Sequence, residues 1–289
     1  MRTDGQEAPL SAHTQTGRNS AEAAGAAAKP PWEPSSKPHP ARVYDYWYGG
    51  GVHYPADRAV AERFIEIYPE IKVGLRENIA FLRRAVTCLV REAGIRQFLD
   101  VSAGIAPAGN THEVAQALAP ESRVVYALDD PAVLARARAT FESTPEGAVA
   151  FVEENITRPD SVIRQARELL DFTQPIGVIS LMTLQFVVDD NEAYGIVGRF
   201  MNAVPPGSHL VVSIPTADLM EPGVHEQLMR AVRNLGIQVR FRSRREFGGF
   251  FRGLELLPPG IEYVPRWRDE DEPQPRPRPP KVGGHAAVG

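Results

Sequence analysis

Apolar and polar positions along the middle of the chain predict strands and helices in alternation. Five short stretches are continuously apolar at their centres, and each is followed by a segment with apolar residues at three- and four-residue spacing. Strands with apolar centres are typical of parallel sheets that helices cover on both faces. The five predicted strands are Phe98–Val101, Val124–Leu128, Ala148–Val152, Ile176–Leu181 and His209–Ile214.

Two further strands are expected near the end of this pattern. Gln238–Phe241 and Ile261–Val264 flank a short predicted helix at Arg244–Phe251 and suit an antiparallel end to the sheet. The predicted fold class is therefore α/β: a doubly wound, seven-stranded, mostly parallel, Rossmann-like sheet. In such folds a ligand is expected at the carboxyl ends of the first strands.

Composition divides the chain into four parts. Residues 1–38 are rich in Ala, Gly, Ser, Pro and Thr, and we expect a disordered N-terminal arm there; the proline-rich residues 269–289 are expected to form a disordered tail. Residues 39–93 hold an aromatic and glycine-rich segment, and residues 94–268 hold the Rossmann-like domain. The first of these two parts also contains two predicted helices, near Ala56–Tyr68 and Glu70–Ala93.

The turn after the first predicted strand has the composition of a nucleotide-binding turn. Asp100 ends the strand, small residues follow as far as Gly104, and Asn110 starts a helix. Small residues let the backbone approach a ligand closely, and the free N–H groups of a helix start attract anionic groups. Ser102 stands where a full glycine fingerprint has Gly, so the turn alone is a weak signal.

Five aromatic residues surround a triple glycine between Ala41 and Tyr54. One interpretation is a segment that caps the core with its rings. The other is an N-terminal helical lid whose glycine hinge closes Tyr46, Tyr48 and His53 over a substrate. In an enzyme, His53 and Tyr46 would be the best candidates for a general base, because histidine titrates near neutral pH. Packing explains Tyr46 equally well.

Charge and composition exclude several classes of function. A net charge of −4 without a basic stripe gives no electrostatic footprint for nucleic acid. Cys88 is the single cysteine, and no set of His, Cys, Asp and Glu has the spacing of metal ligands, so no disulfide and no metal are expected. No apolar run approaches the ~20 residues of a membrane span, and the chain starts without a secretory signal. A cytoplasmic protein is expected.

Several stretches of the chain together resemble one bacterial family. They are Ala41–Tyr46, Gly94–Asp100, Gly109–Gln116, Tyr194–Val197, Val204–Ser208 and Pro265–Trp267. With the order of the predicted strands, they resemble class I S-adenosylmethionine-dependent methyltransferases, in a family formerly treated as a domain of unknown function. The resemblance extends over roughly Pro38 to Arg268.

The resemblance implies the cofactor, the kind of substrate and the residues that contact them. The implied cofactor is S-adenosylmethionine, without a metal, and the implied substrate is a small molecule. The implied cofactor-binding residues are Asp100, Ser102, Gly104, Asp129, Asn155, Ile156 and Met182. The implied substrate or lid residues are Arg42, Tyr48, Thr183 and Gln185.

The sequence departs from the family pattern at the cofactor site. Besides Ser102, the acid that would bind the ribose hydroxyls aligns with Leu128, with Asp129 one place on, and the acid for the adenine amine aligns with Asn155. Gln185 stands in place of the family's usual histidine. Lost hydrogen bonds to charged groups, at about 1.5–3 kcal/mol each, would weaken cofactor binding by roughly two to four decades. Asp129 and the amide oxygen of Asn155 are the partial replacements.

Three functions stay open on the sequence alone. The leading hypothesis is a methyltransferase that acts on a small, partly apolar acceptor of secondary metabolism. The second keeps the fold, but the degenerate pocket binds another ligand or catalyses a cyclisation or rearrangement. The third is a non-catalytic partner protein that uses the aromatic segment or the tail as its contact surface. The oligomeric state stays open.

Overall fold

The computed structural model of the protein describes residues 37–270, 272 and 283–289. The predicted disordered arm lies outside the described residues except for Lys37 and Pro38. Seven strands form one sheet in the order β3-β2-β1-β4-β5-β7-β6. They are β1 (Gln97–Asp100), β2 (Arg123–Ala127), β3 (Ala148–Val152), β4 (Gly177–Leu181), β5 (His209–Thr216), β6 (Glu262–Tyr263) and β7 (Gly283–Val288).

The first five strands are parallel, and the last two are added in antiparallel pairings. β1 lies between β2 and β4, with Phe98 opposite both Val124 and Gly177. β7 pairs antiparallel with β5 and with β6. The predicted fold class, a doubly wound and mostly parallel seven-stranded sheet, is therefore confirmed.

Two segments differ from the sequence prediction. Gln238–Phe241 is not a strand: Val239 and Phe241 pack against α8, and the Arg240 N–H donates to the Gln185 carbonyl oxygen at 2.8 Å. The seventh strand comes instead from the tail, so the prediction of disorder is wrong for residues 283–288. β7 lacks an apolar run because its small residues lie close to their neighbours: a Cβ on Gly284 would lie only 3.0 Å from the Ile214 carbonyl oxygen.

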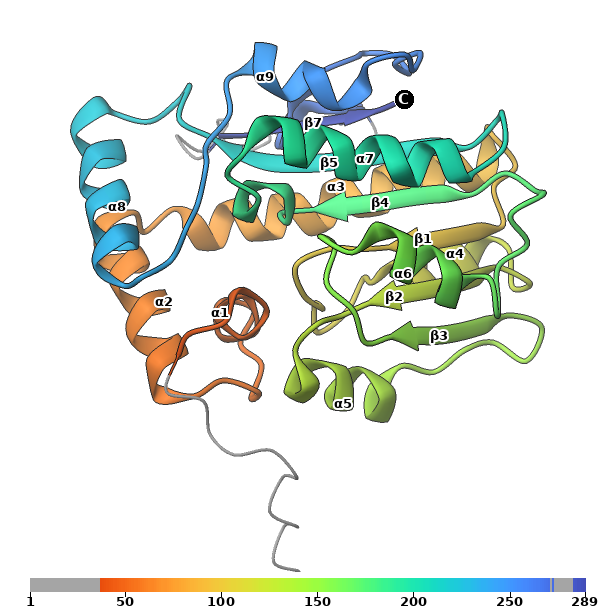
Figure 1. The fold of residues 1–289 in the computed structure, drawn as a ribbon, viewed down its shortest axis with the longest axis horizontal. Helices are drawn as coiled ribbons and strands as arrows, with labels where there is room; N and C mark the ends of the chain where they lie inside the picture. The colour runs from red at the N-terminus through yellow and green to blue at the C-terminus, as the bar shows by residue number, and fades with distance from the viewer. Residues whose placement is uncertain (1–36, 271, 273–282) are drawn as a thin grey trace, which may run out of the picture. The chain divides into compact units, whose positions relative to one another are not determined.

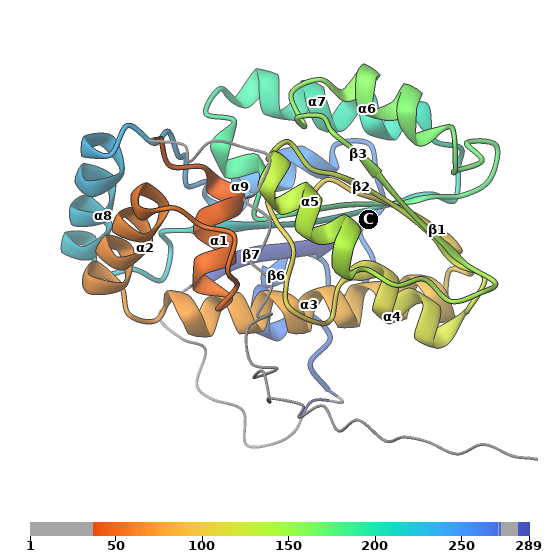
Figure 2. The same ribbon diagram turned by 90° about the horizontal axis from the view of Figure 1, so that it is seen from below.

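Helices cover both faces of the sheet, with α3 and α4 on one face and α6 and α7 on the other (Figure 2). Side chains alternate between two core clusters, so that Phe98 and Val124 face one cluster while Leu99 and Val125 face the other. The helices are α1 (Pro40–Trp47), α2 (Pro55–Ile67), α3 (Ile71–Arg91), α4 (Thr111–Leu118), α5 (Pro131–Thr140), α6 (Pro159–Ala166), α7 (Asp190–Ala203), α8 (Pro222–Asn234) and α9 (Arg244–Gly248), with short 3₁₀ turns at Leu184–Phe186, Gly249–Phe251 and Val264–Arg266.

The first two helices lie beyond the end of the sheet towards which the parallel strands run (Figure 1). Val43 of α1, Val60 and Phe64 of α2, and Leu228 of α8 share a third core cluster. We call α1 and α2 the helical cap. Because the cap adjoins the carboxyl ends of the strands, it is positioned over the part of the sheet where such folds bind ligands.

Candidate functional site

The turn after β1 is held in place by the buried carboxylate of Asp100. Its Oδ1 accepts a hydrogen bond from the Ser102 N–H at 2.9 Å, and its Oδ2 accepts one from the Thr111 hydroxyl at 2.6 Å. Burial raises the pKa of Asp100, and the hydrogen bonds from Ser102 and Thr111 act against that rise. Asp100 therefore fastens the turn to the first residue of α4.

Ser102 fits this turn without strain. It is not among the described residues with a positive φ, so the glycine that the family pattern has there is not needed for backbone freedom. The Ser102 hydroxyl oxygen accepts a hydrogen bond from the Leu181 N–H at 3.1 Å, which ties the turn to the end of β4. A Cβ on Gly104 would lie 3.5 Å from the Ala41 carbonyl oxygen, an ordinary contact distance. The substitution of glycine at position 102 thus leaves the turn intact.

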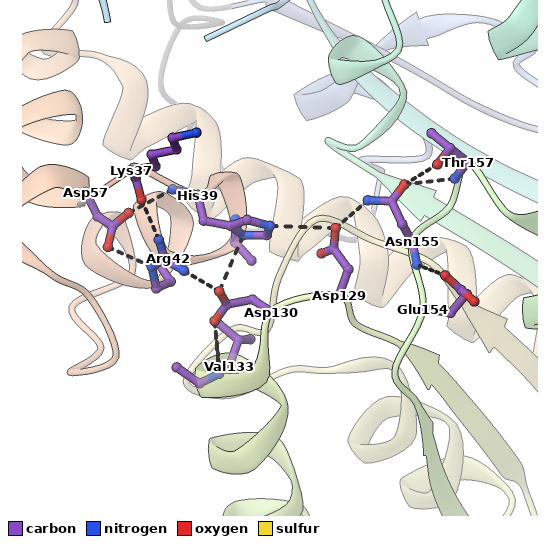
Figure 3. A network of polar contacts seen from close by, with 12 residues as sticks. Lys37, His39, Arg42, Asp57, Asp129, Asp130, Val133, Glu154, Asn155 and Thr157 are labelled. Carbon is purple, nitrogen blue, oxygen red and sulfur yellow. Dashed lines mark hydrogen bonds and ion pairs between the residues drawn. The ribbon is translucent and has the colours of Figure 1, made fainter. Parts of the chain in front are cut away.

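Three consecutive residues after β2 have different surroundings. Leu128, which aligns with the family's ribose-binding acid, is buried in the same core cluster as Leu134. Asp130 is buried and caps α5, where its carboxylate accepts hydrogen bonds from two backbone N–H groups. The Asp129 side chain is 33% exposed and lies opposite Asn155 (Figure 3). Of the three, only Asp129 presents a carboxylate to a cavity.

The Asp129 carboxylate has partners on both sides. Its Oδ2 accepts a hydrogen bond from the Asn155 side-chain amide and lies 3.6 Å from the His39 Nε2 (Figure 3). Burial acts to raise the pKa of Asp129, but the contacts with His39 and Asn155 lower it more, so that the pKa lies below the usual value. Asp129 is therefore an ionised hydrogen-bond acceptor at neutral pH.

Asn155 mainly shapes its own loop. Its Oδ1 accepts two hydrogen bonds from Thr157, one from the backbone N–H at 2.9 Å and one from the hydroxyl at 2.8 Å. A carbonyl oxygen has two lone pairs, and both are used here. The Asn155 amide oxygen therefore does not offer a free acceptor to an adenine amine, unlike the partial replacement expected from the sequence.

Two cavities adjoin at the turn after β1. We call the first the acidic cleft and the second the turn cleft; Ser102 and Ala103 form a wall common to both. The acidic cleft is lined by Asp129, Asn155, Ile156, Thr183 and His39, among others. The turn cleft is lined by Asp100, Gly104, Tyr48, Asn78 and Met182, among others.

A third cavity, the apolar pocket, lies beneath the helical cap. It shares Tyr44 and Met182 with the turn cleft, and it shares Pro40 and Phe186 with the acidic cleft. Its other walls include Trp47, Phe64, Met220, Leu228 and Phe241. The three cavities are therefore neighbours with walls in common, and the apolar pocket is the one beneath the cap.

The residues after β4 separate these cavities. Met182 adopts a left-handed backbone conformation with φ of 50°, which is rare for a residue other than glycine. Thr183 turns its hydroxyl to the Val101 and Leu181 carbonyl oxygens at 3.1 and 3.0 Å. Gln185 lines the apolar pocket and is 1% exposed. The structure thus brings all three sequence-predicted residues of this segment to cavity walls.

Arg42 does not line any of the three cavities and is instead a buried structural residue. Its Nε donates to the Asp57 carboxylate at 2.8 Å, and its Nη1 donates to Asp130 (Figure 3). Both carboxylates are buried as well. The structure thus places Arg42, which the sequence suggested as a substrate or lid residue, in an ion-pair network that joins α1 to α2 and α5.

Tyr46 and His53, the predicted general bases, lie away from the three cavities. The Tyr46 hydroxyl donates to the exposed Glu62 carboxylate at 3.0 Å, and the His53 ring contacts the Gly50 carbonyl oxygen at 3.1 Å. The reason is helical periodicity, since Tyr44 and Tyr48 share one face of α1 while Tyr46 projects from another. The structure therefore does not bring these two residues together with the residues that line the three cavities.

Backbone conformation and packing explain two of the three consecutive glycines, Gly49 and Gly50. Gly49 has a φ of 79° and follows the end of α1. A Cβ on Gly50 would collide with the ion pair between Asp45 and Arg136. Close approach to this ion pair therefore explains the glycine at position 50 without a hinge.

Sequence reasoning missed three residues that line the cavities: His39, Tyr44 and Asn78. Tyr44 had a usable signal, because it lies four residues before Tyr48 in a segment that forms a helix. His39 precedes α1 as its N-cap. Asn78 lies within the predicted helix at Glu70–Ala93. The only signal in the sequence that it lines a cavity is that it is a polar residue on a mostly apolar face of this helix.

Two searches of the described residues bear on other classes of site. Across residues 37–270, 272 and 283–289, no group of three or more His, Cys, Asp or Glu side chains is arranged to hold a metal ion. In the same part of the chain, no helix has both the length and the apolar character to cross a membrane.

Comparison with known proteins supports the resemblance seen in the sequence. A crystal structure of a DUF574 family protein from Streptomyces avermitilis is 38% identical, with a TM-score of 0.81 over 87% of this chain and 97% of that chain. A candidate methyltransferase from Thermobifida fusca is 33% identical, with a TM-score of 0.78 over 88% of this chain and 94% of that chain. A search of the curated proteins gave no match. Residues 29–289 match the S-adenosyl methyltransferase family, and the chain belongs to that family.

Proposed function

We propose that this protein binds S-adenosylmethionine in the acidic and turn clefts and methylates a small molecule held in the apolar pocket. The observation that carries the proposal is the shared wall of Tyr44 and Met182 between the turn cleft and the apolar pocket. A transferase must hold its two reactants side by side, away from water. Membership of the S-adenosyl methyltransferase family supplies the cofactor class.

The residues of the acidic cleft fit the nucleoside part of the cofactor. The ionised Asp129 carboxylate is an acceptor for ribose hydroxyls, and its contacts with Asn155 and His39 both fall on Oδ2. Ile156 gives an apolar surface for the adenine ring. The turn from Ser102 to Gly104 presents small residues on the path to the turn cleft. When bound, S-adenosylmethionine supplies an electrophilic methyl group on a positively charged sulfur.

The apolar pocket limits the acceptor to small and mainly apolar molecules. Its walls are largely aliphatic and aromatic, with rings from Tyr44, Trp47, Phe64, Phe186 and Phe241. Apolar surface buried from water contributes about 25 cal/mol per Å² to binding. An aromatic acceptor of secondary metabolism would fit these walls, and orientation would account for much of the rate.

Calorimetric titration with S-adenosylhomocysteine tests the proposal directly. We expect binding in the micromolar range for the wild type and roughly 10–100-fold weaker binding for Asp129→Asn, because a hydrogen bond to a charged acceptor is lost. Glu153→Gln is the matched control: it removes the same charge from an exposed side chain nearby, and its affinity should stay within about twofold of the wild type.

Two outcomes would contradict the proposal. Equal affinities for Asp129→Asn and the wild type would remove Asp129 from the site. A wild type that does not bind S-adenosylhomocysteine even at millimolar concentration would favour the alternative of a pocket for another ligand. Asn155 supports that alternative, since both lone pairs of its amide oxygen are engaged by Thr157.

A further inference from the structure

Gln185, in the wall of the apolar pocket, has a buried polar atom that lacks a partner among the described residues. Among the described residues that line the pocket, Gln185 is the one whose side chain has a buried oxygen, Oε1, without a hydrogen bond. The side chain as a whole is 1% exposed. Buried polar groups in folded proteins are almost always paired, so this exception calls for an explanation.

The orientation of the Gln185 amide is fixed by its other atom. Nε2 donates hydrogen bonds to the Met182 carbonyl oxygen at 2.7 Å and to the Tyr44 hydroxyl oxygen at 3.1 Å. A carbonyl oxygen only accepts hydrogen bonds, so the amide nitrogen must lie on the side of Met182. Exchange of the nitrogen and oxygen would place two acceptors against each other. Oε1 is therefore the atom left without a partner.

The partners of Nε2 place the Gln185 amide group near the turn cleft. Tyr44 and Met182, which hold Nε2, both line the turn cleft as well as the apolar pocket. The Gln185 backbone is held too, since its carbonyl oxygen accepts from the Arg240 N–H at 2.8 Å. Burial raises the pKa of Tyr44, so its hydroxyl stays protonated. The Gln185 amide is therefore held next to residues that border both the turn cleft and the apolar pocket.

We propose that Gln185 Oε1 accepts a hydrogen bond from a hydroxyl or N–H group on an otherwise apolar ring compound, and that this bond places the group at the junction with the cofactor cleft. The inference rests on the proposed function only in naming this compound the methyl acceptor. The chemical class follows from the walls, which are mostly aliphatic and aromatic, and from the unpaired acceptor Gln185 Oε1. Gln185 would then be a specificity-determining residue for the acceptor.

The binding of three naphthalene probes tests this inference. Fluorescence titrations would compare 2-naphthol, which has a donor, with 2-methoxynaphthalene and naphthalene, which have none. We expect the wild type to bind 2-naphthol about tenfold more tightly than either of the others, because only the hydroxyl satisfies the buried oxygen. In Gln185→Met, which keeps the length of the side chain without its oxygen, the three affinities should agree within about twofold.

A second variant separates the oxygen from the hydrogen bonds that hold it. Tyr44→Phe removes one partner of Nε2 and leaves both Oε1 and the bond to Met182, so the preference for 2-naphthol should stay within about threefold of the wild-type preference. The preference is the affinity for 2-naphthol divided by the affinity for either other probe. A wild-type ratio near one, an unchanged ratio in Gln185→Met, or no binding of any probe would overturn the proposal. If Gln185→Met does not fold, the wild-type preference still decides.

The titration with S-adenosylhomocysteine keeps this inference distinct from the proposed function. Gln185 does not line the acidic or the turn cleft, so Gln185→Met should bind S-adenosylhomocysteine like the wild type. Selective binding of 2-naphthol without any binding of S-adenosylhomocysteine would support the role of Gln185 and reject methyl transfer. Binding of S-adenosylhomocysteine without a preference among the probes would support the proposed function and reject the role of Gln185.

Discussion

The acidic cleft and the apolar pocket adjoin but satisfy their polar groups in opposite ways. In the acidic cleft, Asp129 contacts His39 and Asn155, and Asn155 in turn accepts two hydrogen bonds from Thr157. In the apolar pocket, the oxygen of Gln185 is buried without any partner. A ligand that approaches Asp129 Oδ2 or Asn155 Oδ1 shares those atoms with internal partners, whereas Gln185 Oε1 has no internal partner among the described residues.

This difference shows where selectivity and affinity would come from. A polar group that exchanges one hydrogen bond for another gains little net free energy, about 0.5–1.5 kcal/mol for a typical bond. A buried acceptor that finds its first partner gains more, since the penalty of leaving it unpaired is removed. We therefore expect the cleft to bind its ligand with moderate affinity and the pocket to discriminate strongly for a donor group.

The largest effect is expected from the residue that holds the cap over both cavities. Arg42→Met would leave the buried carboxylates of Asp57 and Asp130 without their cation and should lower the free energy of unfolding by about 3–5 kcal/mol. The midpoint of thermal unfolding should fall by roughly 10 °C. Unfolding in urea followed by circular dichroism measures the free energy of unfolding, and a temperature scan by the same method measures the midpoint.

The control for this prediction is an ion pair of the same kind on the surface of the cap. Arg63 pairs with Glu66 on α2, and both side chains are more than half exposed. Arg63→Met should change stability by less than about 1 kcal/mol. If Arg42→Met is as stable as Arg63→Met, the buried network does not hold the cap in place.

The sheet could be predicted from the sequence because its signal is local. Continuous apolar runs such as Val124–Leu128 and helix starts such as Asp130-Pro131 indicate the secondary structure of the segments in which they occur. β7 could not be predicted, since Gly283 to Val288 owe their strand to pairing with β5, more than 60 positions earlier in the sequence, and not to their own propensity. The same holds for Gln238–Phe241, whose apolar residues pack on α8 instead of joining the sheet.

The sequence could indicate which residues line the cavities where strand ends place them, but not where the face of a helix places them. Ser102, Asn155 and Met182 follow strands, and the topology brings their ends together. Tyr46 was preferred to Tyr44 because composition does not reveal which face of a helix meets the cavity. The ion pairs of Arg42 join α1 to residues 15 and 88 positions away, and no local pattern predicts such pairs.

A smaller effect, on the pH dependence of stability, is expected from His112 behind the turn cleft. His112 is buried, its ring contacts the Tyr126 hydroxyl at 2.9 Å, and burial lowers its pKa below the usual 6.5. Below about pH 6.5 the unfolded chain therefore binds a proton that the folded protein does not, and stability falls as the pH falls. His209 and His285 act in the same direction, because burial lowers their pKa values too.

Comparison of the wild type with His112→Gln measures how much His112 contributes to this pH dependence of stability. Between about pH 7.5 and about pH 5.5, the variant should lose less unfolding free energy than the wild type, since one of the three groups no longer titrates. Urea unfolding at a series of pH values gives both slopes. A variant slope equal to that of the wild type would mean that the His112 ring takes up its proton in the folded protein as readily as in the unfolded chain.

The smallest effect is expected from a substitution of His39. It tests whether the internal contacts of Asp129 weaken the binding of a ligand in the acidic cleft. His39→Asn keeps a side chain that can cap α1 but removes the contact between His39 and Asp129. A polar contact between two partly exposed side chains contributes about 0.2–1 kcal/mol, so affinity for S-adenosylhomocysteine should rise by roughly two- to fivefold as the Asp129 carboxylate becomes available. The probe preference of the apolar pocket should not change, because His39 does not line it. A lower affinity for S-adenosylhomocysteine would show that His39 is part of the binding surface and that its contact with Asp129 does not weaken ligand binding.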